Sequence, residues 1–220
     1  MNHMNKVSSG SIVVDELLDE GLDKDKITCV YGVAASGKTT LAMLSAVECA
    51  ANGGKVLFID SENGFSVERF KQISCNNLDL LKNVFVIKVK SLYDQLQKIE
   101  NLKRDFDKFS LIIIDTIGNY YRKEVVRDVF ANKQLYKQFD ILREIADNNV
   151  PILITNQIYT DPVNKSVKIV GGKIVRNNVD CLIELVKLGN NRGAVLRKHY
   201  SIKENKEKMF KIVEKGFIPL

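Results

Sequence analysis

The sequence lacks the long apolar runs and paired cysteines that mark membrane, secreted and zinc-held proteins. No apolar stretch approaches the roughly 18 residues that a membrane helix requires, and Met1 to Lys6 do not open a secretory signal. The four cysteines are widely spaced and form no C-x-x-C pair, which argues against a zinc knuckle or a disulfide framework. We therefore expect a cytoplasmic protein without membrane contact.

What the chain does contain is typical of a soluble globular domain. Its 220 residues are 45% hydrophobic and 27% charged, and they include no repeats or low-complexity tracts. A chain of this length buries well over half of its unfolded surface, so it can form a substantial core. We expect a short tail at residues 1–7 and a single domain over residues 8–220.

The positive charge is concentrated in the last quarter of the chain. Residues 161–220 hold 13 Lys and Arg against 6 Asp and Glu, so 13 − 6 gives +7. The first 160 residues hold 20 against 21, so 20 − 21 gives −1. Clustered basic side chains neutralise the phosphates of a polyanionic partner such as nucleic acid. A solvated basic face without a partner is the alternative that charge alone leaves open.

Short apolar runs alternate with segments of helical periodicity through most of the chain. The expected strands are Ile27–Tyr31, Lys55–Ile59, Val84–Ile87, Leu111–Ile114 and Ile152–Thr155. One expected helix spans about residues 38–51, and a second has its apolar face at Leu92, Leu96, Ile99, Leu102 and Phe106. A long third helical region is expected to bury Val125, Val129, Leu135, Phe139, Leu142 and Ile145. This alternation predicts an α/β fold with a mostly parallel sheet flanked by helices.

The C-terminal part has a different pattern. Cys181–Leu188 and Ala194–His199 flank the Gly-rich segment 189–193, which indicates a hairpin. Met209–Glu214 would add a third strand. We therefore expect the sheet to end in an antiparallel C-terminal β edge.

A complete phosphate-binding motif lies between the first strand and the first helix. Residues 32–39 match G-x-x-x-x-G-K-[ST] at every fixed position, in the strand–loop–helix context that confirms the motif. Lys38 would reach the β- and γ-phosphates, and Thr39 would place a hydroxyl on Mg²⁺. We assign ATP binding to Gly32, Val33, Ala34, Ala35, Ser36, Gly37, Lys38, Thr39 and Thr40.

Two acidic residues are candidates to complete a hydrolytic centre. Asp115 ends an apolar strand and would hold Mg²⁺ through water, or else cap a helix. Glu62 follows another strand and would activate the attacking water. The residues leave open that Asp60 or Ser61 caps the next helix and that Glu62 is only an acid of its first turn. His199 and the cysteines are expected to be structural.

Several motifs in a fixed order resemble the ATPase core of RecA-type recombinases, especially those of archaea and eukaryotes. The order is the P-loop, Asp60-Ser61-Glu62, Asp115 and Ile154-Thr155-Asn156-Gln157. Further matches are Ser9-Gly10-Ser11, Asp15, Leu17-Leu18, Glu68-Arg69, Tyr121-Arg122 and Gly171-Gly172-Lys173. The resemblance runs from about residue 8 to the C-terminus and implies a RecA-like P-loop NTPase core that uses ATP and Mg²⁺. It implies a core-only paralogue, since only residues 1–7 precede the core.

The resemblance also implies roles for individual residues. Glu62 takes the position that activates water, and Gln157 takes that of a γ-phosphate sensor facing the DNA loops. With Lys38, these form the expected catalytic set. One DNA loop falls near Tyr120, Tyr121, Arg122 and Lys123, and a second spans roughly residues 158–173. The expected DNA contacts are Tyr120, Tyr121, Arg122, Lys165, Lys168, Lys173 and Arg176.

The function implied by this resemblance is that of an accessory protein in homologous recombination and DNA repair. Its expected partners are single-stranded or branched DNA, the main archaeal recombinase and other repair proteins, and it would be a monomer or small oligomer. We expect weak ATPase activity and no strand exchange, because the polymerisation segment is missing and groups supplied in trans by a neighbour are absent. The alternatives are a DNA-dependent ATPase that forms filaments or rings and a KaiC-like signalling ATPase without DNA.

Overall fold

The computed structural model describes residues 5–160 and 165–220. Its strands are β1 (Lys6–Val7), β2 (Leu22–Asp23), β3 (Ile27–Gly32), β4 (Val56–Asp60), β5 (Val84–Lys88), β6 (Leu111–Asp115), β7 (Ile152–Thr160), β8 (Val167–Ile169), β9 (Cys181–Leu188), β10 (Asn191–Lys198), β11 (Glu207–Val213) and β12 (Gly216–Pro219). Its helices are α1 (Ile12–Leu17), α2 (Lys38–Ala51), α3 (Val67–Ile73), α4 (Leu92–Leu102), α5 (Gly118–Glu124), α6 (Ala131–Ala146) and α7 (Gly172–Asn178). Short 3₁₀ helices span Leu78–Asn83 and Phe106–Lys108.

A ten-stranded sheet organises the molecule. Its strands follow the order β12-β11-β10-β9-β3-β7-β6-β4-β5, and β8 pairs with β7 outside this path. Neighbours from β9 to β5 are parallel, whereas β10, β11 and β12 continue the sheet with antiparallel pairing. The predicted α/β class, with an antiparallel C-terminal edge, is confirmed. Because parallel strands end at the same edge of a sheet, the segments after β3, β4, β6 and β7 meet there.

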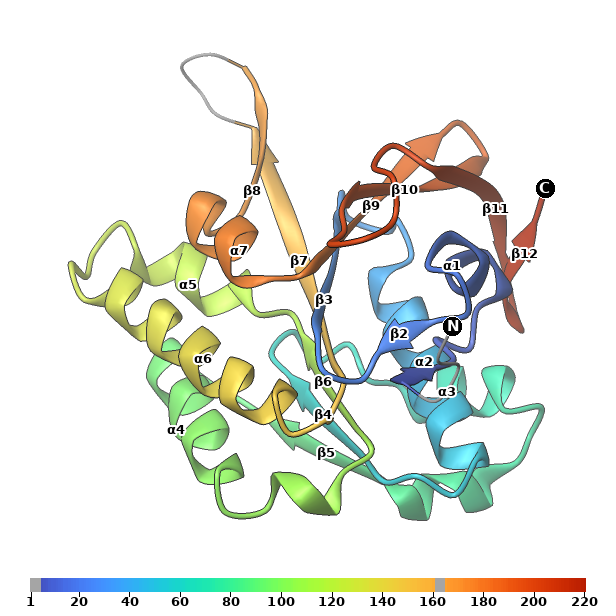
Figure 1. Cartoon of the computed structure of the whole chain (residues 1–220), viewed down its shortest axis with the longest axis horizontal. Coiled ribbons are helices and arrows are strands. Elements are labelled where there is room, and N and C mark those ends of the chain that lie inside the picture. The colour runs from blue at the N-terminus through green and yellow to red at the C-terminus, as the bar shows by residue number, and fades with distance from the viewer. Residues whose placement is uncertain (1–4, 161–164) are drawn as a thin grey trace.

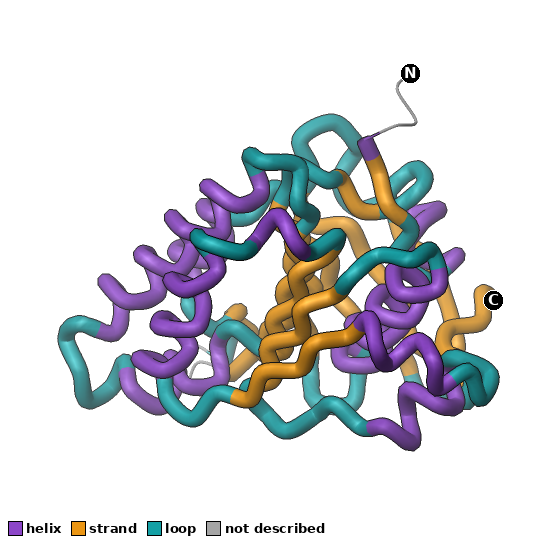
Figure 2. Tube along the Cα trace, turned by 90° about the horizontal axis from the view of Figure 1, so that it is seen from below, coloured by secondary structure: helices purple, strands orange, loops and turns teal. Residues whose placement is uncertain are grey.

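Helices cover both faces of the sheet. Figure 1 shows α4, α5 and α6 on one side and α1, α2 and α3 on the other, and Figure 2 shows the strands between the two layers. Strands β4 and β6 are buried at every position. Their side chains alternate between the two cores, so a continuous apolar sequence is required there.

Helix α4 has the apolar face that its sequence predicts. Leu92, Leu96, Ile99 and Leu102 are all buried against the core. The Ser91 hydroxyl accepts a hydrogen bond from the Asp94 amide at 3.0 Å and caps the first turn. Phe106 lies beyond the helix, in a 3₁₀ turn, and is partly buried.

The long helical region after β6 is two helices, so that prediction was wrong in part. Helix α5 ends at Glu124 and α6 begins at Ala131. In the connection, the Asp128 carboxylate accepts a hydrogen bond from the Phe130 amide at 2.8 Å, which replaces helical pairing with a local turn. Val129 is 87% exposed, contrary to its predicted burial.

Three predicted boundaries also differ from the structure. Strand β7 continues to Thr160, five residues beyond the expected end at Thr155, because its outer part pairs with β8. The C-terminal hairpin has a tight turn, since β10 already begins at Asn191. Lys6 and Val7, assigned above to a tail, pair with β2.

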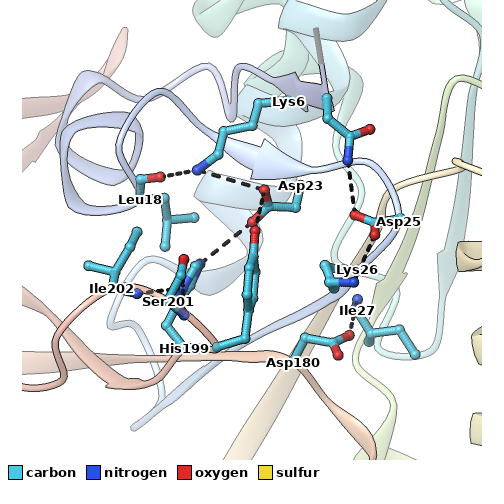
Figure 3. A network of polar contacts seen from close by, with 12 residues as sticks. Lys6, Leu18, Asp23, Asp25, Lys26, Ile27, Asp180, His199, Ser201 and Ile202 are labelled. Carbon is cyan, nitrogen blue, oxygen red and sulfur yellow. Dashed lines mark hydrogen bonds and ion pairs between the residues drawn. The ribbon is translucent and has the colours of Figure 1, made fainter. Parts of the chain in front are cut away.

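A polar cluster around Asp23 fastens the C-terminal strands to the N-terminal segment (Figure 3). The Tyr200 hydroxyl donates to Asp23 at 3.0 Å, His199 Nε2 lies 3.5 Å from the carboxylate and Lys6 Nζ lies 3.7 Å from it. His199 Nδ1 accepts hydrogen bonds from the amides of Ser201 and Ile202. His199 is therefore a structural residue far along the chain from the phosphate motif, as predicted.

Candidate functional site

The P-loop links β3 to α2 at the carboxyl edge of the sheet. A Cβ atom at Gly32 would lie 2.3 Å from the Leu185 carbonyl oxygen, so only glycine allows β9 to pass this close. Gly37 has a φ of 110°, and a Cβ there would meet Ile212 at 2.9 Å and the Phe217 ring at 3.0 Å. The two fixed glycines of the motif are thus required by backbone geometry and by the C-terminal strands.

Lys38 is folded inward under the loop. Its side chain is largely buried, and Nζ donates to the carbonyl oxygens of Gly32 at 3.1 Å and Val33 at 2.9 Å. Burial lowers the pKa of Lys38, while the nearby carboxylates of Asp115 and Glu62 oppose that shift. The ammonium group is held by loop carbonyls that a phosphate group would replace as its partner.

A cleft of about 490 Å³ opens above this loop, and we call it the P-loop cleft. It is lined by Gly32, Ala34, Ala35, Gly37, Lys38, Thr39, Thr40, Glu62, Arg122, Gln157 and Ile158. Most residues expected to bind nucleotide therefore meet here, together with Glu62 and Gln157. Val33 and Ser36 do not line the cleft, because Val33 faces solvent and Ser36 is fully buried beneath the loop.

Asp115 presents a buried carboxylate at the end of β6. Its Oδ1 accepts a hydrogen bond from the Thr155 hydroxyl, whereas Oδ2 is buried without a hydrogen-bond partner among the described residues. Burial raises the pKa of Asp115 to about 6, although the hydroxyls of Thr155 and Thr39 oppose this. Both Asp115 Oδ2 and Thr39 Oγ1 lie within 4 Å of a Cβ placed on Gly64, so they face the same small space.

This donor set suits Mg²⁺ bound together with phosphates. Mg²⁺ keeps several waters and takes only one or two protein oxygens in nucleotide sites. Asp115 Oδ2 and the Thr39 hydroxyl supply that number. No cluster of three or more His, Cys, Asp or Glu that would hold a metal by itself occurs within residues 5–160 and 165–220.

Asp60 shapes the loop that carries Glu62. Its carboxylate accepts hydrogen bonds from the amides of Glu62 at 3.1 Å, Gly64 at 3.0 Å and Phe65 at 3.1 Å. Helix α3 begins later and is capped by Ser66. Asp60 therefore caps a loop, not a helix, and Glu62 is not an acid of the first helical turn.

Glu62 is joined to the end of β6 and to the middle of β7. Its Oε1 accepts hydrogen bonds from the Thr116 hydroxyl at 2.9 Å and from Gln157 Nε2. Asn156, next to Gln157, donates to the Val170 carbonyl oxygen at 2.9 Å, and the Val170 amide donates to the Gln157 carbonyl oxygen at 3.0 Å. A short path of hydrogen bonds thus leads from Glu62 to the segment after β8.

Four expected DNA contacts lie on one projecting part of the molecule. We call residues 158–160 and 165–176 the basic arm; Figure 1 shows β7 and β8 extending beyond the sheet there, beside α7. All charged residues in these ranges are basic. Lys165, Lys173 and Arg176 are exposed and Lys168 is half-buried. Residues 161–164 of the expected second DNA loop lie outside the described residues.

The other three expected DNA contacts have different surroundings. Tyr121 is buried, with its hydroxyl donating to Asn132 at 2.7 Å, so it offers no face to a base. The Tyr120 hydroxyl donates to the Val89 carbonyl oxygen at 2.9 Å. Arg122 lines the P-loop cleft. Two of them border the basic arm: Arg122 lines the P-loop cleft together with Ile158, and the Tyr121 ring lies 3.9 Å from a Cβ placed on Gly171.

The sequence analysis assigned no role to three residues that hold the predicted catalytic groups in place. Thr116, Thr155 and Asn156 each anchor a neighbour through a side-chain hydrogen bond. Their only signal in the sequence is adjacency to a strand-ending acid or to Gln157, because the contacts join strands far apart in the chain.

Comparisons with known proteins agree with this geometry. The family model described as Rad51 matches residues 2–219. The DNA repair and recombination protein RadB of Methanobrevibacter smithii is 36% identical, over 99% of this chain and 96% of that protein. The corresponding protein of Methanocaldococcus jannaschii is 35% identical, over 93% of this chain and 98% of that protein. A crystal structure of the RadB recombinase superposes with a TM-score of 0.81 at 30% identity, covering 96% of this chain and 97% of that one. The chain therefore belongs to the Rad51 family, in the branch of the RadB proteins.

Proposed function

We propose that this chain binds ATP with Mg²⁺ in the P-loop cleft and DNA through the basic arm, as an accessory protein of DNA repair and homologous recombination. The contact between Glu62 and Gln157 carries the proposal, because Gln157 lies on the strand that continues into the arm. The names of the RadB relatives, DNA repair and recombination proteins, support the same role. No helix among residues 5–160 and 165–220 has the length and apolarity to cross a membrane.

The P-loop supplies the triphosphate site. Its backbone amides and the start of α2 face the phosphates, and Lys38 exchanges its loop carbonyls for phosphate oxygens. Thr39 and Asp115 hold Mg²⁺, which neutralises phosphate charge when bound. The lining of the P-loop cleft by Gly32, Lys38 and Thr39 supports this assignment.

Glu62 acts on the attacking water. Its Oε1 is occupied by Thr116 and Gln157, which fix the carboxylate while Oε2 accepts the proton. Gln157 reports the terminal phosphate to the basic arm through Asn156 and Val170. Turnover is proposed to be weak, without strand exchange, because a monomer or small oligomer lacks the groups that neighbours supply in a filament.

Binding of single-stranded and branched DNA tests this proposal. Fluorescence anisotropy across a salt series, with Mg·ATP, Mg·ADP or no nucleotide, should show an affinity that falls steeply with salt and depends on the nucleotide. Complexes with the main recombinase are expected under the same conditions. Absence of DNA affinity at low salt would contradict the proposal and favour a signalling ATPase; large assemblies with ATP on DNA would favour a filament-forming motor.

A further inference from the structure

Arg122, expected above to contact DNA, lies at the proposed ATP site. It lies in the last turn of α5 and lines the P-loop cleft together with Lys38, Glu62 and Gln157. It is the only guanidinium group among the described residues that line this cleft. Its neighbour Lys123 is directed elsewhere, with Nζ 4.8 Å from the centre of the Tyr120 ring.

Helix α5 is anchored on several sides, so the backbone that carries Arg122 is held in place. Asn119 Nδ2 donates to the Ser61 carbonyl oxygen at 2.6 Å, which ties the helix to the residue before Glu62. Tyr120 and Tyr121 anchor the following turn through their hydroxyl groups. At the start of the helix, a Cβ on Gly118 would lie 2.3 Å from Asn156 Oδ1, so α5 packs closely against the strand that carries Gln157.

The guanidinium group of Arg122 forms no ion pair with a carboxylate of the described residues. It has no ion-pair partner within residues 5–160 and 165–220, and its side chain is exposed to the cleft. The acids Asp115 and Glu62 both lie near Lys38. A bound triphosphate would therefore find Arg122 as a second cation, beside Lys38, in a cleft that Glu62 and Gln157 also line.

We propose that Arg122 binds the γ-phosphate of ATP from within the same chain and stabilises the phosphoryl group during hydrolysis. This inference rests on the proposed ATP site. A guanidinium group matches phosphate oxygens bidentately, and an arginine in this role accelerates phosphoryl transfer strongly. It supplies in cis a cation that a filament neighbour would otherwise provide in trans.

The reaction it assists is simple hydrolysis. The water oxygen forms a bond to the γ-phosphorus while the bond from that phosphorus to the β–γ bridging oxygen breaks. The electron pair of the broken bond stays on ADP, and the proton of the water passes to Glu62 and then to solvent. Arg122 exchanges no atom; it balances the negative charge on the oxygens of the transferring group.

Arg122→Gln tests the proposal, with Arg122→Lys as a partial rescue and Lys123→Gln as a control on the same helix. Affinities for Mg·ATP and Mg·ADP are measured by isothermal titration, together with turnover at saturating ATP and single-stranded DNA affinity without nucleotide. Arg122→Gln should weaken ATP binding about tenfold or more, leave ADP binding within about twofold and slow turnover at least about tenfold. Lys123→Gln should leave the ratio of ATP to ADP affinity unchanged.

Two results would overturn the inference. One is an unchanged ratio of ATP to ADP affinity in Arg122→Gln with unchanged turnover. The other is an unchanged ratio with lost DNA affinity, which would make Arg122 a DNA contact. Thermal unfolding of each variant confirms that it is folded. Lys38→Ala is measured in parallel. If Lys38→Ala retains ATP affinity, the proposed function is wrong. If Lys38→Ala loses ATP affinity and Arg122→Gln keeps an unchanged ratio of ATP to ADP affinity, only the role of Arg122 is wrong.

Discussion

The P-loop cleft and the basic arm are built in different ways. At the cleft, Lys38 and Glu62, with Asp115 behind Thr39, are each held by hydrogen bonds to other strands or loops. On the arm, Lys165 and Lys173 are exposed, with the positive charge spread over a hairpin and a helix. A cleft that binds one defined chemical group needs fixed distances, whereas a surface that follows a flexible polyanion needs mainly charge.

Substitutions in the two regions should therefore have different effects. Loss of one fixed group in the cleft should have a large effect on one step and little effect elsewhere. Loss of one charge on the arm should lower DNA affinity only slightly, and loss of a second charge should lower it further by a similar amount.

Lys38→Ala should have the largest effect. It removes the ammonium group that binds the β- and γ-phosphates, so Mg·ATP affinity should fall at least about 100-fold. Isothermal titration measures this, with Lys55→Ala, an exposed lysine just before β4, as the matched control. ATP affinity within tenfold of the original chain would contradict the assignment of the cleft.

Glu62→Gln should separate binding from hydrolysis. The amide oxygen can still accept hydrogen bonds from Thr116, but it cannot take a proton from water. Turnover should fall about 100-fold while ATP affinity stays within about threefold. Glu68→Gln, on the exposed surface of α3, is the control. An unchanged turnover in Glu62→Gln would show that another group activates the water.

Asp115→Asn should raise the free energy of unfolding at high pH and weaken Mg²⁺-dependent ATP binding. The folded-state pKa of Asp115 is about 6, above its ordinary value of 3.8. The free energy of unfolding therefore falls as the pH rises from 3.8 through 6, because ionising the buried carboxyl group destabilises the folded protein. The variant should gain about 1–3 kcal/mol in free energy of unfolding at pH 8 and almost none at pH 4. Urea unfolding at the two pH values measures this.

The same variant should weaken Mg²⁺-dependent ATP binding, since the neutral amide is a poorer partner for the cation. In the original chain, Mg·ATP affinity should fall as the pH drops below about 6 and Asp115 takes up a proton. Equal stability of the variant and the original chain at both pH values would contradict the buried, ionising carboxylate.

Replacing Lys165 and Lys168 together by Gln should have the smallest effect. Loss of two phosphate contacts should weaken single-stranded DNA binding about threefold to tenfold and reduce the log–log salt slope by about 1.4. Nucleotide affinity should not change. Lys203→Gln with Lys211→Gln removes the same charge from exposed positions far along the chain and is the control. Equal loss in both pairs would mean that net charge, not the arm, binds DNA.

The sequence predicts local features of the fold and the site well, but it does not predict contacts between segments that are far apart in the chain. The P-loop, the buried strands and α4 were predicted because fixed spacing and periodicity are local properties. The exposure of Val129 was not predicted, because it depends on the turn at Asp128. The burial of Tyr121 was not predicted either, because it depends on a contact with Asn132. The placement of Arg122 in the cleft depends on how α5 packs against β7, which no local pattern records.

The proposed function is tested most sharply by ATP turnover with and without single-stranded DNA, measured in the same buffer as DNA binding. We predict that the protein binds both ATP and DNA, that turnover is weak, and that DNA changes turnover little. Vigorous DNA-stimulated hydrolysis would contradict the proposed function and make this chain a recombinase-type motor in which Glu62 is the central catalytic residue.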